Sequence, residues 1–490
     1  MPWCRELSRP MIKQTVINPV KNNDSNKKNK ISNGVNRIKF FVSAILLFLI
    51  SYILGINLVI PIFLLSLFVY LDFSYRNLSL KSHKLLNLTF LFVIICATGY
   101  FINRAGWSIY YIPFSTIPML SAILFNELEI SLLLTLAAAF TIASISGNNY
   151  LGVLFSISGI LSSIFVFGAR KRMTIIRAGF LIGLVQMISL FVIDRFLVKN
   201  PTEYVILMLN GIICSFIALA TLPIFEILFK TVTNISLLEL TDTPLLNRLK
   251  LETPGTYHHS LIVGNLSEAA CEAVGANGLL ARIGAYYHDI GKIEKAEYFT
   301  ENQDISQSKH DVLSPTMSKL IIMNHVKEGA ELAKKHKLNP RIIDFILQHH
   351  GSSLVYYFYR RALENLEEDQ EIKEEGFRYP GSKPNTKETA IVLLADSVEA
   401  ATRALNDPNR TKIEEVVHKI INNKFIDGQL DECNLTLKDL EKIAEIFIRI
   451  LSGVYHNRVA YPENSRSENN HKKPAKENSH QSEKDKKSSP

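Results

Sequence analysis

The stretch YYHDIGK, residues 286–292, places a histidine and an aspartate next to each other, just ahead of a glycine. A glycine here is typical of a helix end, where one metal ion can take the imidazole of His288 and the carboxylate of Asp289 together. An isolated His-Asp pair is common and indicates little. Eight of the 13 histidines, however, fall between His258 and His350, and they include two His-His pairs. Because each buried imidazole needs partners for two nitrogens, this clustering predicts a metal site.

The candidate ligands offer nitrogen and carboxylate donors and no thiolate. They are His259, His288, Asp289, His325, His349, His350 and Asp396. This donor set suits manganese, iron, nickel or zinc better than calcium or magnesium, which prefer oxygen throughout. Seven ligands are too many for one ion with an open position, so we expect two ions bridged by Asp289. Two ions about 3.5 to 4 Å apart can activate a water and bind phosphoryl oxygens, which predicts hydrolysis of a phosphate ester by a hydroxide held between them.

Two cations near these ligands are candidates for contact with a phosphate. Lys292 follows the His-Asp pair by one turn, and we predict that it acts in catalysis together with Asp289. Asp396 follows the apolar run 391–395, where an unpaired carboxylate would be costly to bury, and this favours a ligand role. Arg403 lies seven residues further on, on nearly the same helix face. Its pattern fits a substrate contact and a structural salt bridge equally well.

The apolar residues are unevenly distributed along the chain. Residues 38–229 are almost continuously apolar, whereas residues 240–460 have the mixed charge of a soluble domain. A membrane-spanning helix needs roughly 17 to 25 apolar residues. Eight segments qualify, near 38–55, 57–73, 85–103, 108–125, 128–146, 150–168, 174–198 and 205–229. We therefore predict a membrane domain of eight helices, or of seven if one short segment is re-entrant.

The positive charge indicates the orientation of these helices. The net charge of +8 comes mostly from residues 1–39, which carry nine Lys or Arg against two acidic residues. Basic flanks of this kind are a topology signal, so we expect no nucleic-acid polymer as a partner. Together with the basic loops at 76–84 and 170–172, they place both chain ends in the cytoplasm if the spans number eight, but not seven. Charged residues fall near the predicted helix ends, which favours an anchor or a sensor over a transporter.

The C-terminal half reads as helical throughout. Apolar residues recur at spacings of three and four from residue 257 to 454, and β-branched runs between turn residues are missing. The five cysteines form no CxxC pair, so neither a disulfide framework nor a thiolate zinc site is indicated. We predict an all-α protein with five parts: a disordered basic arm (1–37), the membrane domain (38–229), a coupling linker (230–252), a cytoplasmic metal phosphohydrolase domain (253–462) and a disordered tail (463–490).

Six short strings now resemble, in order, the HD domain of the bacterial seven-transmembrane HD proteins. They are GTYHHSLIVGNLSEAA (255–270), AYYHDIGK (285–292), NHVKEG (324–329), QHHGSS (348–353), FRYPGSKPNTKE (377–388) and LADSVEAATR (394–403). Members of the PgpH type are cyclic di-AMP phosphodiesterases, and the likeness spans roughly residues 57–460. Family members usually carry a large extracytoplasmic domain between the first two membrane helices, whereas here only about three residues separate the segments at 38–55 and 57–73.

The resemblance implies a helical HD phosphohydrolase with two transition metals, manganese or iron, that cleaves cyclic di-AMP to pApA at the inner face of a bacterial cell membrane. One ion would be held by His259, His288, Asp289 and Asp396, and the other by Asp289, His325, His349 and His350. Alternative substrates are cyclic di-GMP, an alarmone or a dNTP. A catalytically idle nucleotide receptor is a further alternative, and a homodimer stays open. The loop 364–385 is either a lid or specificity element, or a simple connection.

Overall fold

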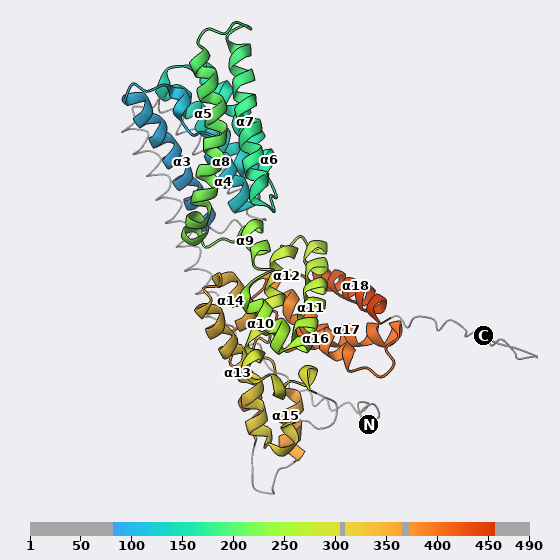
Figure 1. Cartoon of the computed structure of the whole chain (residues 1–490). Coiled ribbons are helices and arrows are strands. Elements are labelled where there is room, and N and C mark those ends of the chain that lie inside the picture. Colours follow the sequence, from blue (N-terminus) through green and yellow to red (C-terminus); the bar gives the residue numbers. More distant parts are fainter. Residues whose placement is uncertain (1–81, 304–308, 365–371, 456–490) are drawn as a thin grey trace, which may run out of the picture.

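The computed structural model describes residues 82–303, 309–364 and 372–455. Within these ranges every regular element is a helix, and β pairing is limited to one antiparallel bridge between Leu354 and Arg378. The predicted all-α class is therefore confirmed (Figure 1). The predicted arm, the spans at 38–55 and 57–73, and the predicted tail lie outside the described residues.

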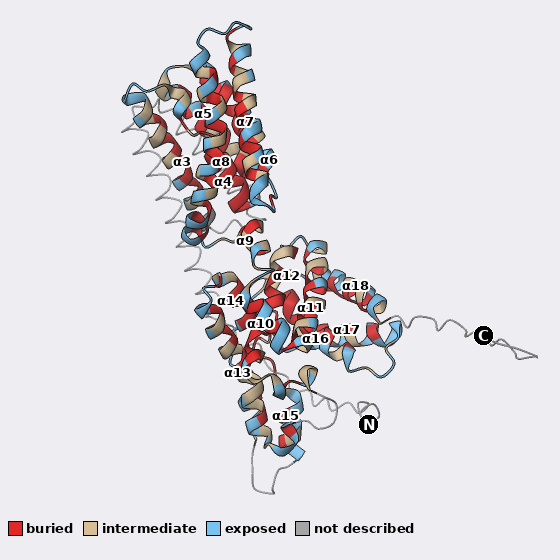
Figure 2. Cartoon of the chain, viewed as in Figure 1, coloured by how far each residue is buried: buried red, intermediate tan, exposed pale blue. Residues whose placement is uncertain are grey.

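An apolar helical bundle forms the first part of the described chain. It consists of α3 (Ser82–Arg104), η1 (Ile109–Tyr111), α4 (Thr116–Phe125), α5 (Leu128–Ser146), α6 (Asn149–Val166), α7 (Arg172–Ile193) and α8 (Pro201–Phe229). Five of these helices, α3 and α5 to α8, are long and apolar enough to cross a membrane. The bundle exposes large apolar side chains such as Phe140, Phe180 and Ile213. Figure 2 shows that the helices of the bundle carry both buried and exposed residues. An apolar outer surface of this kind suits a lipid environment.

The span expected at 108–125 differs from a continuous helix. Only α4 is α-helical, because Pro113 and the extended residue before it interrupt the turn that precedes it. The irregular half lies against the N-terminal half of α8, where Asn210 donates hydrogen bonds to the carbonyl oxygens of Tyr110 and Ile112 at 3.0 Å each. At the other end, Phe125 stacks on Phe229, the last residue of α8. The segment therefore runs alongside α8 from Asn210 to Phe229, although just ten of its residues form α4.

Two short helices connect the bundle to the second part. They are α9 (Asn234–Glu239) and α10 (Pro244–Glu252). Arg172, at the start of α7, pairs with Glu239 of α9 at 2.7 Å. On the other side of the linker, the hydroxyl of Tyr287 donates to the carbonyl oxygen of Leu240 at 2.7 Å. The linker thus contacts the bundle and also the helix that precedes the His-Asp pair.

The second part is a helical domain, as the apolar spacing from residue 257 to 454 predicts. Its helices are α11 (Pro254–Ala273), α12 (Gly278–Tyr287), η2 (Ile290–Tyr298), η3 (Thr300–Asn302), η4 (Lys309–Val312), α13 (Pro315–Lys335), α14 (Pro340–Gln348), α15 (Tyr356–Glu364), η5 (Glu374–Phe377), α16 (Lys387–Arg403), α17 (Arg410–Ile426) and α18 (Leu437–Val454). Helix α16 is buried on all sides from Thr389 to Asp396, so it forms the centre of the domain.

Candidate metal centre

Helix ends bring the predicted ligands together. Helix α12 begins at the Asn277 cap and ends at Tyr287, so that His288 is its C-cap and Asp289 is already outside it. Helix α14 ends one residue before His349 in the same way. His350 follows His349 directly, and the remaining ligands His259, His325 and Asp396 lie within the helices α11, α13 and α16. Because these helices pack around one point, residues that are far apart in sequence become neighbours.

The first group of donors forms around one oxygen of Asp289. Its Oδ2 lies 3.1 Å from Nε2 of His288 and 3.8 Å from Nε2 of His259. Asp396 closes the group, with its Oδ1 at 3.0 Å from Nε2 of His259 and 3.8 Å from Nε2 of His288. The two histidines and Asp289 are almost fully buried. The arrangement could hold one metal ion.

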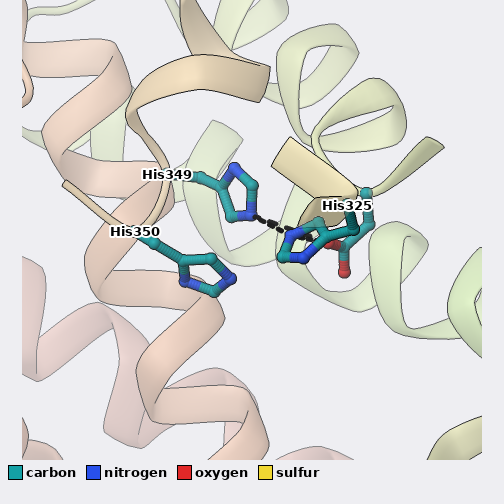
Figure 3. Close-up of side chains that lie close together, drawn as sticks. His325, His349 and His350 are labelled. Atoms are coloured by element: carbon teal, nitrogen blue, oxygen red, sulfur yellow. Dashed lines mark hydrogen bonds and ion pairs between the residues drawn. The ribbon is translucent and has the colours of Figure 1, made fainter. Parts of the chain in front are cut away.

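The second group of donors forms around the other oxygen of Asp289. Its Oδ1 lies 3.3 Å from Nε2 of His325 and 3.6 Å from Nε2 of His349. His350 completes the group, which could hold a second ion. Figure 3 shows the three imidazoles turned toward one another, with His325 and His349 joined by a dashed line. Asp289 is thus shared by both groups and contributes one oxygen to each.

The imidazoles are oriented as metal ligands require. In four of them Nδ1 lies at 2.5 to 3.2 Å from an oxygen: the Glu399 carboxylate for His259, and the backbone carbonyl oxygens of Ala285 for His288, Ile322 for His325, and both Phe345 and Ile346 for His349. An Nδ1–H that donates to such an oxygen leaves the lone pair on Nε2, facing the shared space.

The distance between two of these nitrogens tests whether an ion fits. Nε2 of His325 and Nε2 of His349 lie 3.2 Å apart. Two lone pairs at this distance repel each other in the absence of a cation or proton. Two nitrogens bound to one ion at about 2.1 Å are expected to lie roughly 3.0 to 3.4 Å apart. The described residues therefore fit a metal ion at this position.

Charge is distributed unevenly across the centre. Burial lowers the pKa of His288, but the neighbouring Asp289 and Asp396 outweigh burial and raise it to about 10. Burial would raise the pKa of Asp289, yet His288 and Lys292 hold it well below its usual range. Burial and the neighbouring His349 keep the pKa of His350 well below that of free histidine. Asp289 is therefore ionised and His350 is neutral, which is the state in which each binds a metal, whereas His288 would have to give up a proton to bind one through Nε2.

The two predicted cations have different surroundings. The ammonium of Lys292 lies 2.8 Å from Oδ2 of Asp289 and 2.6 Å from Oε1 of Glu301. It therefore reaches the centre, but two carboxylates already share it. Arg403 instead lies 3.7 Å from Glu399, the carboxylate that faces His259. Of the two roles predicted for Arg403, this contact favours the structural salt bridge over the substrate contact.

The comparisons with known proteins agree with this architecture. Residues 50–233 match the family described as "7TM receptor with intracellular HD hydrolase", and residues 256–401 match the HD domain family. The cyclic-di-AMP phosphodiesterase PgpH of Bacillus subtilis (strain 168) is 39% identical over 433 residues, which cover 84% of this chain and 60% of that relative. The chain belongs to the 7TM-HD family.

Further relatives of this 7TM-HD protein cover less of the chain. PgpH of Listeria monocytogenes serotype 1/2a (strain 10403S) is 38% identical over 363 residues, or 72% of this chain and 50% of that relative. The crystal structure of the HD domain of L. monocytogenes PgpH is 46% identical and covers 44% of this chain and 100% of that chain, with a TM-score of 0.42. The 7TM-HD protein described here thus spans between half and two thirds of the length of the two curated PgpH relatives.

Three residues of the centre were missed by the sequence analysis of this 7TM-HD protein. Glu399 approaches His259, Glu301 pairs with Lys292, and Tyr379 stacks on His350. Glu399 could have been found, because it lies three residues after Asp396 and so shares its helix face. Glu301 and Tyr379 follow the ligands through irregular segments, and their spacing carries no such signal.

The Glu399 carboxylate should strengthen metal binding through His259. Its Oε2 lies 2.5 Å from Nδ1 of His259, and the residue is 1% exposed. We expect Glu399→Gln to weaken Mn²⁺ binding at the first group by about 10- to 100-fold, because the imidazole loses its charged acceptor. Titration of the metal-free full-length protein in nanodiscs measures this. Glu445→Gln, on an exposed position of α18, is the control, and affinities within twofold of each other would contradict the prediction.

Proposed function

We propose that this protein is a membrane-anchored, metal-dependent phosphodiesterase that hydrolyses cyclic di-AMP to linear pApA. The observation that carries the proposal is the pair of donor groups that share Asp289. Each group could hold one ion, and enzymes that cleave phosphate esters by in-line displacement commonly use two adjacent metal ions. The identities of 39% and 38% to proteins named cyclic-di-AMP phosphodiesterase support the choice of substrate.

Two divalent transition metal ions, Mn²⁺ or Fe²⁺, would occupy the centre. His259, His288 and Asp396 would hold one ion, His325, His349 and His350 the other, and Asp289 would bind both. When bound, the ions would supply Lewis acidity toward the phosphate and lower the pKa of a bound water. The described cysteines are outside both donor groups, which supports hard-to-borderline metals over thiolate-bound zinc.

The residues of the chain have separate tasks in this proposal. Asp289 directs one oxygen to each donor group and so fixes the spacing between them. Lys292 holds Oδ2 of Asp289 and brings a positive charge next to the site where a phosphate would lie. Glu301, on the other side of Lys292, keeps the ammonium in place. Glu399 keeps His259 in the tautomer that binds metal, and Arg403 in turn pairs with Glu399.

Cleavage of cyclic di-AMP by the full-length protein tests the proposal. The protein in nanodiscs is loaded with Mn²⁺ and incubated separately with cyclic di-AMP and with cyclic di-GMP, and the products are separated by chromatography. We expect pApA from cyclic di-AMP, a much slower reaction with cyclic di-GMP, and no product from Asp289→Asn. If the protein cleaves cyclic di-GMP faster than cyclic di-AMP, the proposed substrate is wrong and cyclic di-GMP takes its place. Binding of cyclic di-AMP without cleavage would favour the idle receptor.

We further infer that the metal-binding domain faces the cytoplasm of a bacterium, as do both chain ends. The basic loop 170–172, at the start of α7, lies at the end of the bundle that contacts the linker, as the positive-inside rule requires for a cytoplasmic domain. A cysteine introduced by Lys438→Cys on the exposed face of α18 should react with a membrane-impermeant maleimide only after the cells are permeabilised, whereas reaction in intact cells would show the opposite orientation.

A homodimer stays a prediction, which light scattering on the detergent-solubilised protein can test.

A further inference from the structure

Tyr379 covers the second donor group, although no sequence signal assigned it a role. Its ring stacks on His350 with centroids 4.3 Å apart and planes 27° apart, and it meets the ring of His325 edge-on at 6.3 Å. The residue is only 9% exposed. A side chain in direct contact with two predicted ligands of one ion lies where a bound phosphodiester would have to pass.

The backbone around Tyr379 is held in place from both sides. The N–H of Tyr379 donates to the carbonyl oxygen of Ser353 at 3.0 Å, and Arg378 and Leu354 form the antiparallel bridge. The guanidinium of Arg378 turns the other way and pairs with Asp427 at 2.8 Å. Because neighbouring side chains of an extended segment point to opposite sides, this anchor directs Tyr379 toward the histidines. These backbone contacts and the ion pair of Arg378 therefore fix the position of Tyr379 within the loop 372–385.

The hydroxyl of Tyr379 has no hydrogen-bond partner among residues 82–303, 309–364 and 372–455. The hydroxyl is carried by a ring that lies against His350 and His325, so it borders the second donor group. The hydroxyl oxygen is not one of the fully buried unpaired atoms of the described residues, so it keeps some access to solvent. The hydroxyl is therefore available to a ligand that approaches the second donor group from solvent.

We propose that the Tyr379 hydroxyl donates a hydrogen bond to a phosphoryl oxygen of the bound phosphodiester, while its ring fixes His350 in the second donor group. The hydroxyl stays neutral and transfers no proton, so the step needs no further reactant. A neutral donor suits this place, because Lys292 is already engaged by two carboxylates. For cyclic di-AMP the inference rests on the proposed function, but the contact concerns the phosphodiester group, which any substrate of this class contains.

Removal of the hydroxyl alone tests the proposal. Tyr379→Phe keeps the ring on His350, so the full-length protein in nanodiscs should retain both metal ions by elemental analysis. Its kcat/KM should fall about 10- to 100-fold, the usual effect of losing a hydrogen bond to a charged group. Tyr359→Phe is the matched control, because Tyr359 packs against Phe377 in the same region and, within the described part of the chain, its ring does not stack on the histidines of the centre. We expect no change in its kcat/KM.

The reaction is followed with cyclic di-AMP and, separately, with bis(p-nitrophenyl) phosphate, a diester without nucleobases. If the unmodified protein cleaves the simple diester but not cyclic di-AMP, the proposed substrate fails while Tyr379 can still be tested on the simple diester. A 10- to 100-fold loss in Tyr379→Phe with both metals retained supports the contact. Activity within twofold of the unmodified protein overturns it. Loss of a metal ion in Tyr379→Phe also overturns it, since the hydroxyl would then serve the centre and not the substrate.

Discussion

Replacing Asp289 with asparagine is expected to reduce phosphodiesterase activity on the order of a thousandfold or more. The two oxygens of Asp289 serve different donor groups, at 3.1 Å from His288 and 3.3 Å from His325, so this one substitution weakens both metal positions. Asparagine preserves the volume but offers one neutral oxygen in place of two charged ones. Removal of a single electrostatic contact in an active site already costs about 10²- to 10³-fold. Elemental analysis and turnover of cyclic di-AMP measure the effect on the full-length protein.

Asp431→Asn is the matched control for this substitution. Asp431 has a largely exposed side chain and makes an ion pair with Lys383 at 3.3 Å. The same chemical change at this position should leave metal content and turnover unchanged. If Asp289→Asn kept two ions per chain and turnover within tenfold of the unmodified protein, Asp289 would not bridge the two groups. The two-metal reading of the centre would then be wrong.

The sequence is enough to predict most of the centre because its ligands follow helix signals. His288 and Asp289 come at the end of α12, after an apolar pattern that Asn277 caps, and His349 comes at the end of α14. Asp396 follows a run of apolar residues in α16, which predicts that its carboxylate is buried and needs a partner. In the structure that run is buried on all sides. Where a ligand stands at a helix end or within a buried helix, its local sequence predicts both its position and its environment.

The parts that the sequence does not predict depend on contacts between distant segments. Tyr379 reaches His350 through an irregular loop that a single bridge and the ion pairs of Arg378 hold. Glu301 reaches Lys292 through a 3-10 segment whose spacing has no helical period. In the membrane bundle, the interruption before α4 depends on Asn210, which satisfies carbonyl oxygens that a helix would have paired itself. The local sequence pattern around residues 110–112 does not predict these hydrogen bonds, because Asn210 is about a hundred residues away in the chain.

Replacing Gly291 with alanine is expected to destabilise the metal-binding domain by about 3 kcal/mol or more and to empty the second donor group. A Cβ on Gly291 would lie 1.9 Å from the carbonyl oxygen of His325 and 2.5 Å from the backbone nitrogen of Gly329. Both neighbours are backbone atoms of α13, so no side-chain rotation can relieve the clash, and α13 has to move. Such a movement carries His325 away from Oδ1 of Asp289, which it now approaches to 3.3 Å. Calorimetry of the full-length protein should show the transition of this domain lowered by roughly 6 to 12 °C.

Gly453→Ala separates this effect from the general effect of an added methyl group. Gly453 lies within α18, and a Cβ there would meet no atom within 4 Å. Alanine is a better helix former than glycine by about 1 kcal/mol, so Gly453→Ala should leave the transition unchanged or raise it slightly. Elemental analysis should find the full metal content in Gly453→Ala and a loss in Gly291→Ala that first affects the ion held by His325. A Gly291→Ala protein that melts within 2 °C of the unmodified protein, an interval well below the roughly 6 °C minimum expected, would contradict the argument. The contact between residue 291 and α13 would then not be what sets the position of His325 against Asp289.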